Sequence, residues 1–248
     1  MQHQHLHELD QFEDALIERY HGHPVLARIT RLTEPDFAEV MLQRRFLSLA
    51  FTPAYDLAID LLRDEEGLRI ARVILREEYP DAHGQTPSHR EDVKEDLYRL
   101  GISRAELVAS RPTPATSRAI QGTFELIAEA GAHEDADLRL LTILRFWGEI
   151  LVSVEYERLW QRLEERFTEN GRNVSRFYHP HLVHDAKSHP LATVSLLSGT
   201  HADRLATRLS EMLTDAAAVA AFKESEERAL ALKTAYYDQF GPALGRAG

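Results

Sequence analysis

The chain has 248 residues, a formal net charge of -11 and no cysteine. This length is sufficient for a buried core, and no Pro-, Gly- or Ser-rich linker divides it, so we predict one domain over residues 1–248. The acidic balance argues against nucleic acid or a membrane as the main partner. The lack of cysteine excludes disulfides, thiolate metal sites and cysteine nucleophiles, and it is typical of a cytoplasmic protein.

The first hundred residues show the apolar spacing of helices. We expect residues 1–8, in which His3, His5 and His7 alternate, to form a disordered tail. Beyond it, a threonine followed by an early proline is a typical helix start, and Pro-Gly clusters end helices. The predicted helices cover roughly residues 8–20, 34–51, 54–62, 66–78 and 87–100.

The second half of the chain continues this pattern. Helices are predicted over residues 114–129, 137–168, 179–198, 200–213 and 215–240. No segment alternates with period two over enough length to be a convincing strand. The predicted fold class is therefore all-α, a bundle of about seven to nine helices.

The densest group of potential metal ligands lies between Tyr178 and His189. If residues 181–189 are helical, then His181, Asp185 and His189 recur at i, i+4 and i+8 and share one face within about 80°. Imidazole and carboxylate groups on one face suit a divalent metal such as iron or manganese. The alternative is a solvated, histidine-rich helix face.

Two further segments offer ligands. Glu78 continues the inward row of the predicted helix 66–78, and His89 opens the next one, so the two could converge where these helices meet. The alternative is that both are polar residues at helix ends. Glu155 lies on the most apolar stripe of the helix 137–168, where a buried carboxylate needs a cation. A metal would supply it, and so would a salt bridge to Arg145 or Arg158.

These segments together resemble a known family. Glu77-Glu78, a gap, His89 and a helix ending in Leu100-Gly101-Ile102-Ser103 form one part of the pattern, the inward Glu155 the next, and His181…Asp185…His189 the last. The pattern is similar to that of the haem-oxygenase-like diiron oxidases and oxygenases. Relatives there include the N-oxygenase of nitrosourea biosynthesis, the alkene-forming fatty-acid decarboxylase and the chlamydial para-aminobenzoate synthase.

The resemblance implies a haem-oxygenase-like bundle of about seven core helices that binds two Fe(II) ions, or mixed manganese and iron, and no haem. The ligands carried over are Glu78, His89, Glu155, His181, Asp185 and His189. One departure concerns the last ligand, because the family places its final histidine where this chain has Ser188. His189 directly precedes Pro190, which disfavours helical geometry there, and His184 is the nearest substitute.

The implied activity is oxidation of a small organic substrate by O2. Tyr156 and Tyr178 are candidate catalytic residues, with packing in the core as the alternative. The chain has no glycine fingerprint for a nicotinamide or flavin, so we expect an external electron donor, and a homodimer is compatible with the sequence. The alternatives are a metal-free protein, either a cofactor-independent oxidase of the kind that completes pyrroloquinoline quinone or a TenA-like protein, and a non-enzymatic helical scaffold.

Overall fold

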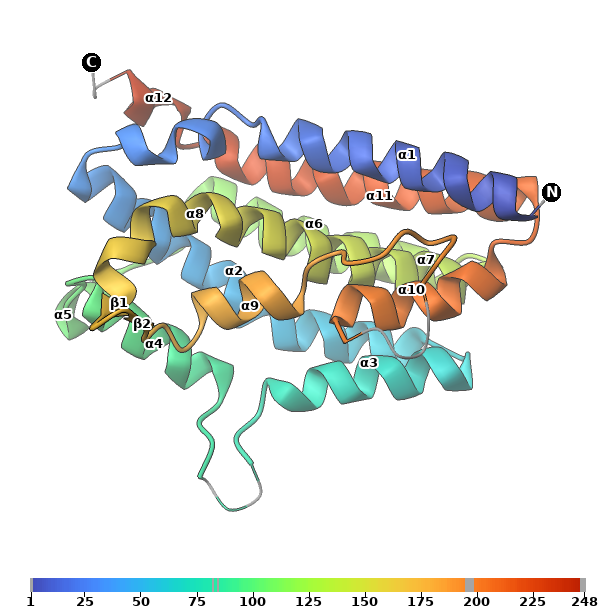
Figure 1. Ribbon diagram of the computed structural model, residues 1–248, viewed down its shortest axis with the longest axis horizontal. Helices are drawn as coiled ribbons and strands as arrows, with labels where there is room; N and C mark the ends of the chain where they lie inside the picture. Colours follow the sequence, from blue (N-terminus) through green and yellow to red (C-terminus); the bar gives the residue numbers. More distant parts are fainter. Residues whose placement is uncertain (1, 82, 84, 195–198, 246–248) are drawn as a thin grey trace.

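The computed structural model describes residues 2–81, 83, 85–194 and 199–245, and within them the fold is an all-α bundle, as predicted (Figure 1). The first half contains α1 (Gln2–His21), the 3-10 helix η1 (Leu26–Arg31), α2 (Glu34–Leu61), α3 (Glu65–Glu77), α4 (His89–Arg99), α5 (Arg104–Ala109) and α6 (Pro114–Gly131). The second half contains α7 (Ala136–Ile143), the π-helix η2 (Leu144–Ile150), α8 (Leu151–Phe167), α9 (Tyr178–His184), α10 (His201–Met212), α11 (Ala216–Asp238) and α12 (Gly241–Leu244).

Local sequence signals account for the helix starts. Thr33 caps α2 by accepting a hydrogen bond from the backbone N–H of Asp36, and a proline follows in the first turn. Ser88 caps α4, where Glu91 returns a hydrogen bond to its backbone in a capping box. After α8, the short strands β1 (Thr168–Glu169) and β2 (Arg172–Asn173) pair around Asn170-Gly171, two residues with positive φ that suit a tight hairpin turn.

Three expectations about helix bounds are corrected. The segment expected as a tail is helical from Gln2, and Leu6 within it is buried in the core. The helices expected over residues 34–51 and 54–62 form one helix, because α2 runs from Glu34 to Leu61 with Pro53 inside it. The helix expected over residues 179–198 ends at His184, and residues 195–198 lie outside the described chain.

The long apolar segment 137–168 is helical up to Phe167, but residues in its middle form a π-helix instead of an α-helix. Residues 144–150 of this segment form η2, in which every residue is buried. A π-helix bonds i to i+5 and so widens the turn, which changes the direction of every side chain that follows relative to a regular helix. Such segments are frequent at functional sites, and this one lies at the centre of the bundle.

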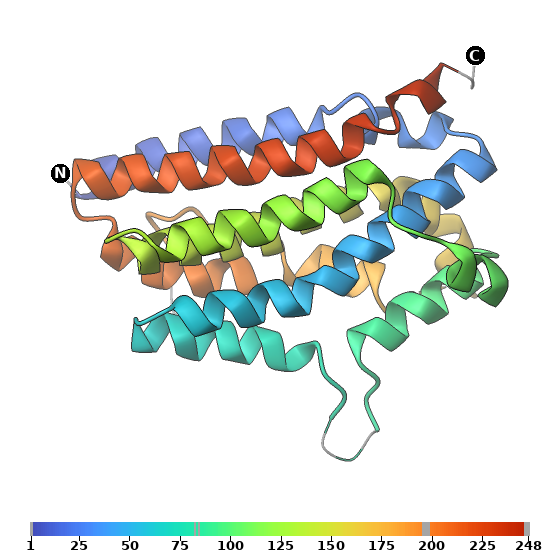
Figure 2. The ribbon, with the colours of Figure 1, turned by 180° about the vertical axis from the view of Figure 1, so that it is seen from behind.

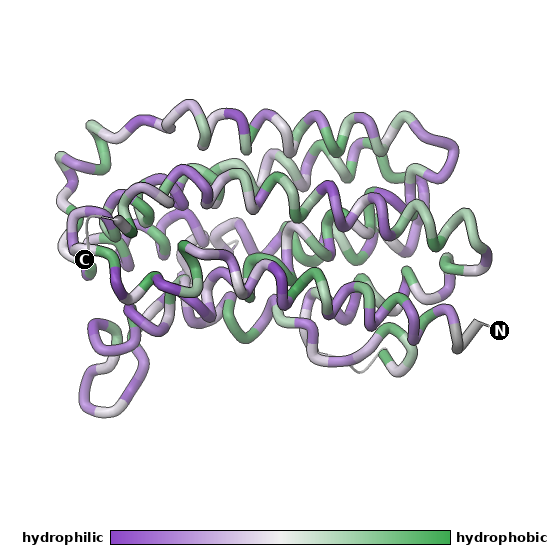
Figure 3. The backbone as a smooth tube through the Cα atoms, turned by 90° about the horizontal axis from the view of Figure 1, so that it is seen from above, coloured by the Kyte–Doolittle hydropathy of each residue, from purple (hydrophilic) through white to green (hydrophobic). Residues whose placement is uncertain are grey.

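The helices pack in layers around a common core. α1 and α11 run side by side in the same direction, and Figures 1 and 2 show them along one face, with α6, α7 and α8 beneath them. α2 packs against α6, and α3 against α10 on the opposite face. Purple and green residues alternate along the helices in Figure 3, as expected of amphipathic segments.

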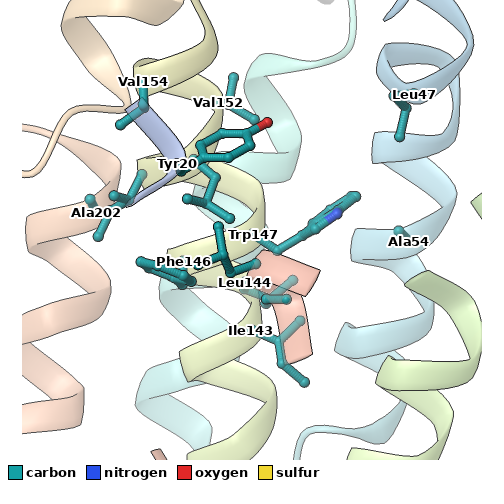
Figure 4. Close-up of a cluster of buried hydrophobic side chains, with 14 of the residues drawn as sticks. Tyr20, Leu47, Ala54, Ile143, Leu144, Phe146, Trp147, Val152, Val154 and Ala202 are labelled. Carbon is teal, nitrogen blue, oxygen red and sulfur yellow. The ribbon is translucent and has the colours of Figure 1, made fainter. Parts of the chain in front are cut away.

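The hydrophobic core runs the length of the bundle, and its central part surrounds η2. Figure 4 shows Trp147 pointing from η2 toward α2, which carries Leu47 and Ala54, while Ala202 of α10 lies on the opposite side of η2. η2 is therefore enclosed by neighbouring helices. In the part of the chain that the structure describes, no helix is long and apolar enough to cross a bilayer.

Candidate metal centre

Two groups of three potential metal ligands lie at the end of α3, the starts of α4 and α10, α9 with its C-cap, and η2. The first group is Glu78, His89 and His181, and the second is Glu149, Asp185 and His201. Within each group the ligand atoms lie within 4.8 Å of one another. His181 and Asp185 are one turn apart, and the backbone N–H of Asp185 donates to the carbonyl of His181, so α9 joins the groups side by side.

The first group is partly buried and presents one imidazole in the form that binds metals. The Nδ1 atom of His181 lies 2.7 Å from the carbonyl oxygen of Phe177, which can only accept, so Nδ1 carries the proton and Nε2 keeps its lone pair. Burial and the neighbouring His89 lower the pKa of His181 well below its usual value and keep it neutral. His89 donates from Nδ1 to Oε1 of Glu78 at 2.8 Å.

The second group is buried and crowded with negative charge. Nδ1 of His201 lies 3.2 Å from Oε2 of Glu149 and 3.3 Å from Oδ1 of Asp185, and Nε2 lies 3.1 Å from Oε2 of Glu77. Burial lowers the pKa of His201, but its hydrogen bonds with these carboxylates outweigh burial and raise that pKa to about 12. Burial and the charge of Glu149 raise the pKa of Asp185 well above its usual value. The site therefore attracts a cation, and a proton on His201 supplies positive charge there.

Residues around the second group hold its ligands in place. The buried hydroxyl of Tyr55 donates to Oε1 of Glu149, and burial together with Glu149 raises the pKa of Tyr55, which keeps the hydroxyl a donor. Arg145 of η2 forms a fully buried ion pair with Glu13 of α1 and donates from Nε to the carbonyl of Ala202 at 3.1 Å. η2 is thereby tied to the first turn of α10, beside His201.

α9 is held at its start by Asp96 of α4. The buried Asp96 carboxylate accepts hydrogen bonds from the hydroxyl of Ser175 at 2.7 Å and from the backbone N–H groups of Arg176 and Phe177 at 3.0 and 2.9 Å. These bonds satisfy N–H groups at the start of α9, which have no acceptor within the helix. They fix α9 relative to α4, and hence His181 relative to His89.

A small cavity lies beside both groups. Its volume is about 30 Å³, and Glu78, His181 and Asp185 line it together with Arg44 and Lys233. Tyr156 also lines this cavity, with the Arg44 guanidinium 5.0 Å from the centre of its ring. The second tyrosine candidate, Tyr178, is buried among aromatic rings. One of them is the ring of Tyr156, whose centroid lies 5.4 Å from that of Tyr178. Of the two tyrosines, it is Tyr156 that lines the cavity beside the ligands.

The structure brings four of the six predicted ligands into the two groups, namely Glu78, His89, His181 and Asp185. Glu155 is a correction. Its buried carboxylate accepts hydrogen bonds from Nε of Arg44 at 2.5 Å, from the hydroxyl of Tyr20 at 2.5 Å and from Nζ of Lys233 at 2.9 Å. The salt bridge considered as an alternative is therefore present, but Arg44 and Lys233 form it rather than Arg145 or Arg158.

His189 is the second correction. α9 ends at His184, five residues before it, so His189 does not share a helix face with His181. The His189 side chain is 50% exposed and binds Oδ2 of Asp203 through Nδ1 at 2.6 Å. His184, the substitute considered for it, is exposed, and its ring stacks 6.4 Å from that of His201. Among the residues that the structure describes, neither histidine belongs to a group of three potential ligands.

Glu149 and His201 were missed by the sequence reasoning. On a regular helix Glu149 is offset from the row of Glu155 by about 120°, so the apolar stripe does not select it. In the structure Glu149 lies in η2, where the turn is wider, and faces Asp185 and His201, whereas Glu155 faces α2 and α11. His201 follows Thr200, which caps α10 through its side chain, so a capping threonine directly before a histidine was the available signal.

Comparison with known proteins is informative only at the level of structure. No family model matches the chain, and no curated protein matches it in sequence. Two crystal structures of a CADD-like protein of unknown function from Nostoc punctiforme PCC 73102 are similar. The structure at 2.00 Å resolution has a TM-score of 0.67 and 13% sequence identity, and the match covers 98% of both chains. The structure at 1.35 Å resolution has a TM-score of 0.66 and 13% sequence identity, and the match covers 100% of this chain and 96% of that chain. The chain therefore has the all-α fold of these CADD-like structures.

Proposed function

We propose that this protein is a non-haem oxidase or oxygenase that holds two Fe(II) ions, or a mixed manganese and iron pair, and uses O2 to oxidise a small organic substrate. The observation that carries the proposal is the pair of adjacent ligand groups on α9, His181 with Glu78 and His89, and Asp185 with Glu149 and His201. The sequence resemblance to haem-oxygenase-like diiron enzymes supports it as well.

The residues fit such a pair of ions. Each group combines carboxylate and imidazole donors, which suit iron and manganese, and lacks the thiolates that favour zinc or copper(I). The lone pair on Nε2 of His181 is free for a metal because Nδ1 is bonded to a backbone carbonyl. The buried carboxylates Glu149 and Asp185 gain most from a cation, since charge is costly to bury without one.

When bound, the two ions would supply electrons to O2 and the oxidising power of the reaction. The chain's own residues would bind the two ions and orient the ligand side chains. Tyr55 orients Glu149, the Phe177 carbonyl orients His181, and Asp96 anchors the helix on which His181 and Asp185 lie. Aromatic side chains such as Phe51 and Trp147 line the cavity and limit the water beside the ligands. An external donor would return the electrons after each turnover.

The metal-free alternatives interpret the same residues differently. In a scaffold or a cofactor-independent oxidase, the His201 imidazolium would remain the permanent partner of Glu77, Glu149 and Asp185. Metal content distinguishes these possibilities directly. The diiron proposal expects about two ions per chain, and the alternatives expect none.

The experiment is anaerobic reconstitution with Fe(II), followed by metal counting and by absorbance after O2 is added. We expect about two irons per chain in the wild type and a transient visible band. His181→Ala and Asp185→Ala should lose iron while keeping their helical circular dichroism. A matched control is His133→Ala, which removes an exposed histidine of the segment between α6 and α7, outside both groups. Full iron content in both ligand variants, or none in the wild type, would refute the proposal.

A further inference from the structure

A positively charged cleft lies near the candidate metal centre, on a chain whose net charge is -11. It lies between α2, α4 and α5, at the end of the bundle where these helices are seen in Figure 2, and has a volume of about 690 Å³. Four cationic side chains line it: Arg45, Arg90, Lys94 and Arg104. No carboxylate is among the described residues of its lining. Charge of one sign on an oppositely charged protein indicates an anionic ligand.

The cations of the cleft are not neutralised by neighbours. Among the described residues, no carboxylate forms an ion pair with Arg90 or Arg104, and Lys94 has only Glu95 at 3.9 Å. Arg45 donates from Nη2 to the carbonyl of Leu107 and the hydroxyl of Ser110, but its buried Nε has no partner within the described chain. Unpaired guanidinium groups are suited to bind carboxylate or phosphate oxygens.

The cleft adjoins the metal ligands through a second pocket. This pocket has a volume of about 280 Å³, shares Leu49, Arg90 and Val93 with the cleft, and is also lined by His89 and Glu78. It in turn shares Ser48, Glu78 and Phe177 with the small cavity beside His181 and Asp185. The three spaces therefore adjoin one another, from the basic cleft to residues of both ligand groups.

The volumes of these three spaces limit the molecules that each can hold. The small cavity of about 30 Å³ has room for only a few water-sized molecules, since a single water needs about 10–15 Å³, and so for O2 or water rather than for an organic substrate. An organic substrate needs the middle pocket, where Leu49, Pro53 and Val93 offer apolar contacts. The basic cleft beyond it is the place for a charged group.

We propose that the substrate is a small amphiphilic organic anion. Its oxyanionic group is bound by Arg90 and Arg104 in the cleft, and its apolar part lies in the middle pocket and ends beside Glu78 and His89. The assignment of this anion as the substrate rests on the proposed function. The anion site itself depends only on residues outside both ligand groups.

The test measures binding to the metal-free protein by calorimetry with three probes of one shape: 4-phenylbutyrate, 3-phenylpropyl phosphate and the neutral 4-phenylbutanamide. We expect at least one anion to bind about tenfold more tightly than the amide, because hydrogen bonds to charged groups are the stronger ones. The tighter of the two anions identifies the group as carboxylate or phosphate. Equal binding of all three probes, or no binding of either anion, would overturn the inference.

The variant is the double substitution Arg90→Gln and Arg104→Gln, at two exposed positions of the cleft. Its control is Arg72→Gln with Arg118→Gln, which removes the same charge from exposed positions of α3 and α6 outside the cleft. We expect the first pair to weaken the anion about tenfold and to leave the amide and the iron content unchanged, and the control pair to change neither. Equal effects of the two pairs would overturn the anion site. Anion binding that follows this pattern without iron binding would instead refute the diiron function alone.

Discussion

Nδ1 of His201 lies 3.2 Å from Oε2 of Glu149, which joins the first residue of α10 to the π-helix. Neither residue belongs to a histidine or carboxylate row that periodicity can detect, and both complete a group of which sequence reasoning had found only Asp185. The second ion of the proposed centre therefore depends on a contact between two segments more than fifty residues apart in sequence. Substituting His201 tests that dependence.

We expect His201→Ala to lower iron content from about two ions per chain to about one, because the second group retains Glu149 and Asp185 without an imidazole. His184→Ala is the matched control, since this exposed ring stacks on His201 at 6.4 Å but is not a ligand. His189→Ala should also retain iron, because that imidazole pairs with Asp203. Metal counting after reconstitution gives the answer. Loss of iron in His189→Ala but not in His201→Ala would restore the original assignment.

What the sequence could predict depended on regular helical geometry. His181 and Asp185 were found because side chains at i and i+4 lie on the same face of a helix, even one that is only two turns long. Helical spacing and the breakers place Glu78 at a helix end and His89 at the next start, which left a polar helix-end role open, and the family resemblance supplied their assignment as ligands. The all-α class follows from the same periodicity and is confirmed by the structure.

What failed depended on features that periodicity does not contain. η2 alters the phase of the segment that holds both Glu149 and Glu155, so a regular helical count could not decide which carboxylate faces the ligands. α9 stops at His184, which moves His189 off the predicted face. The partners of Glu155 come from α2 and α11, far away in sequence, and only tertiary packing selects Arg44 and Lys233 for it.

Glu155→Gln should affect stability rather than metal binding. The substitution removes the charge that Arg44 and Lys233 share and leaves two buried cations without a counter-ion. Breaking a buried ion pair in this way costs about 3–5 kcal/mol, so we expect a corresponding loss in the free energy of unfolding from denaturant titration. The folded fraction should still bind about two irons. Loss of iron at unchanged stability would return Glu155 to the set of ligands.

The stability of the metal-free protein should fall as pH rises above 7. His201 has its pKa raised to about 12, so the protonated form contributes stability fully below the unfolded value of 6.5, and this is lost as pH rises through the folded value. The raised pKa of Asp185 acts in the same direction. Burial lowers the pKa of Lys233 to about 8, which opposes the trend at higher pH, so the useful window is pH 7 to 8.

The measurement compares wild type and His201→Gln by denaturant unfolding within that window, with metals removed by chelation. One proton changes the free energy of unfolding by at most about 1.4 kcal/mol per pH unit, and we expect the variant to have the shallower slope. Addition of Mn(II) should reverse the sign for the wild type, because the metal competes with protons at its ligands and binds more tightly as pH rises. Parallel pH profiles for the two proteins would contradict the assigned charge of His201.

Gly148→Ala should weaken the second group through Tyr55. A Cβ at position 148 would lie 3.1 Å from Cε2 of Tyr55 and 3.4 Å from its hydroxyl oxygen, and that hydroxyl holds Glu149. The ring must therefore move, and misplacing such an outer partner of a ligand costs about 10- to 100-fold in metal affinity.

Gly122→Ala is the control for crowding alone, because its Cβ would meet only the flexible end of Leu232, in a contact between α6 and α11. Both variants should lose up to about 1–3 kcal/mol of stability, partly offset by the helix preference of alanine. Metal titration should separate them, since only Gly148→Ala is expected to release the second ion at concentrations that saturate the wild type. Equal affinities in all three proteins would mean that Tyr55 does not position Glu149.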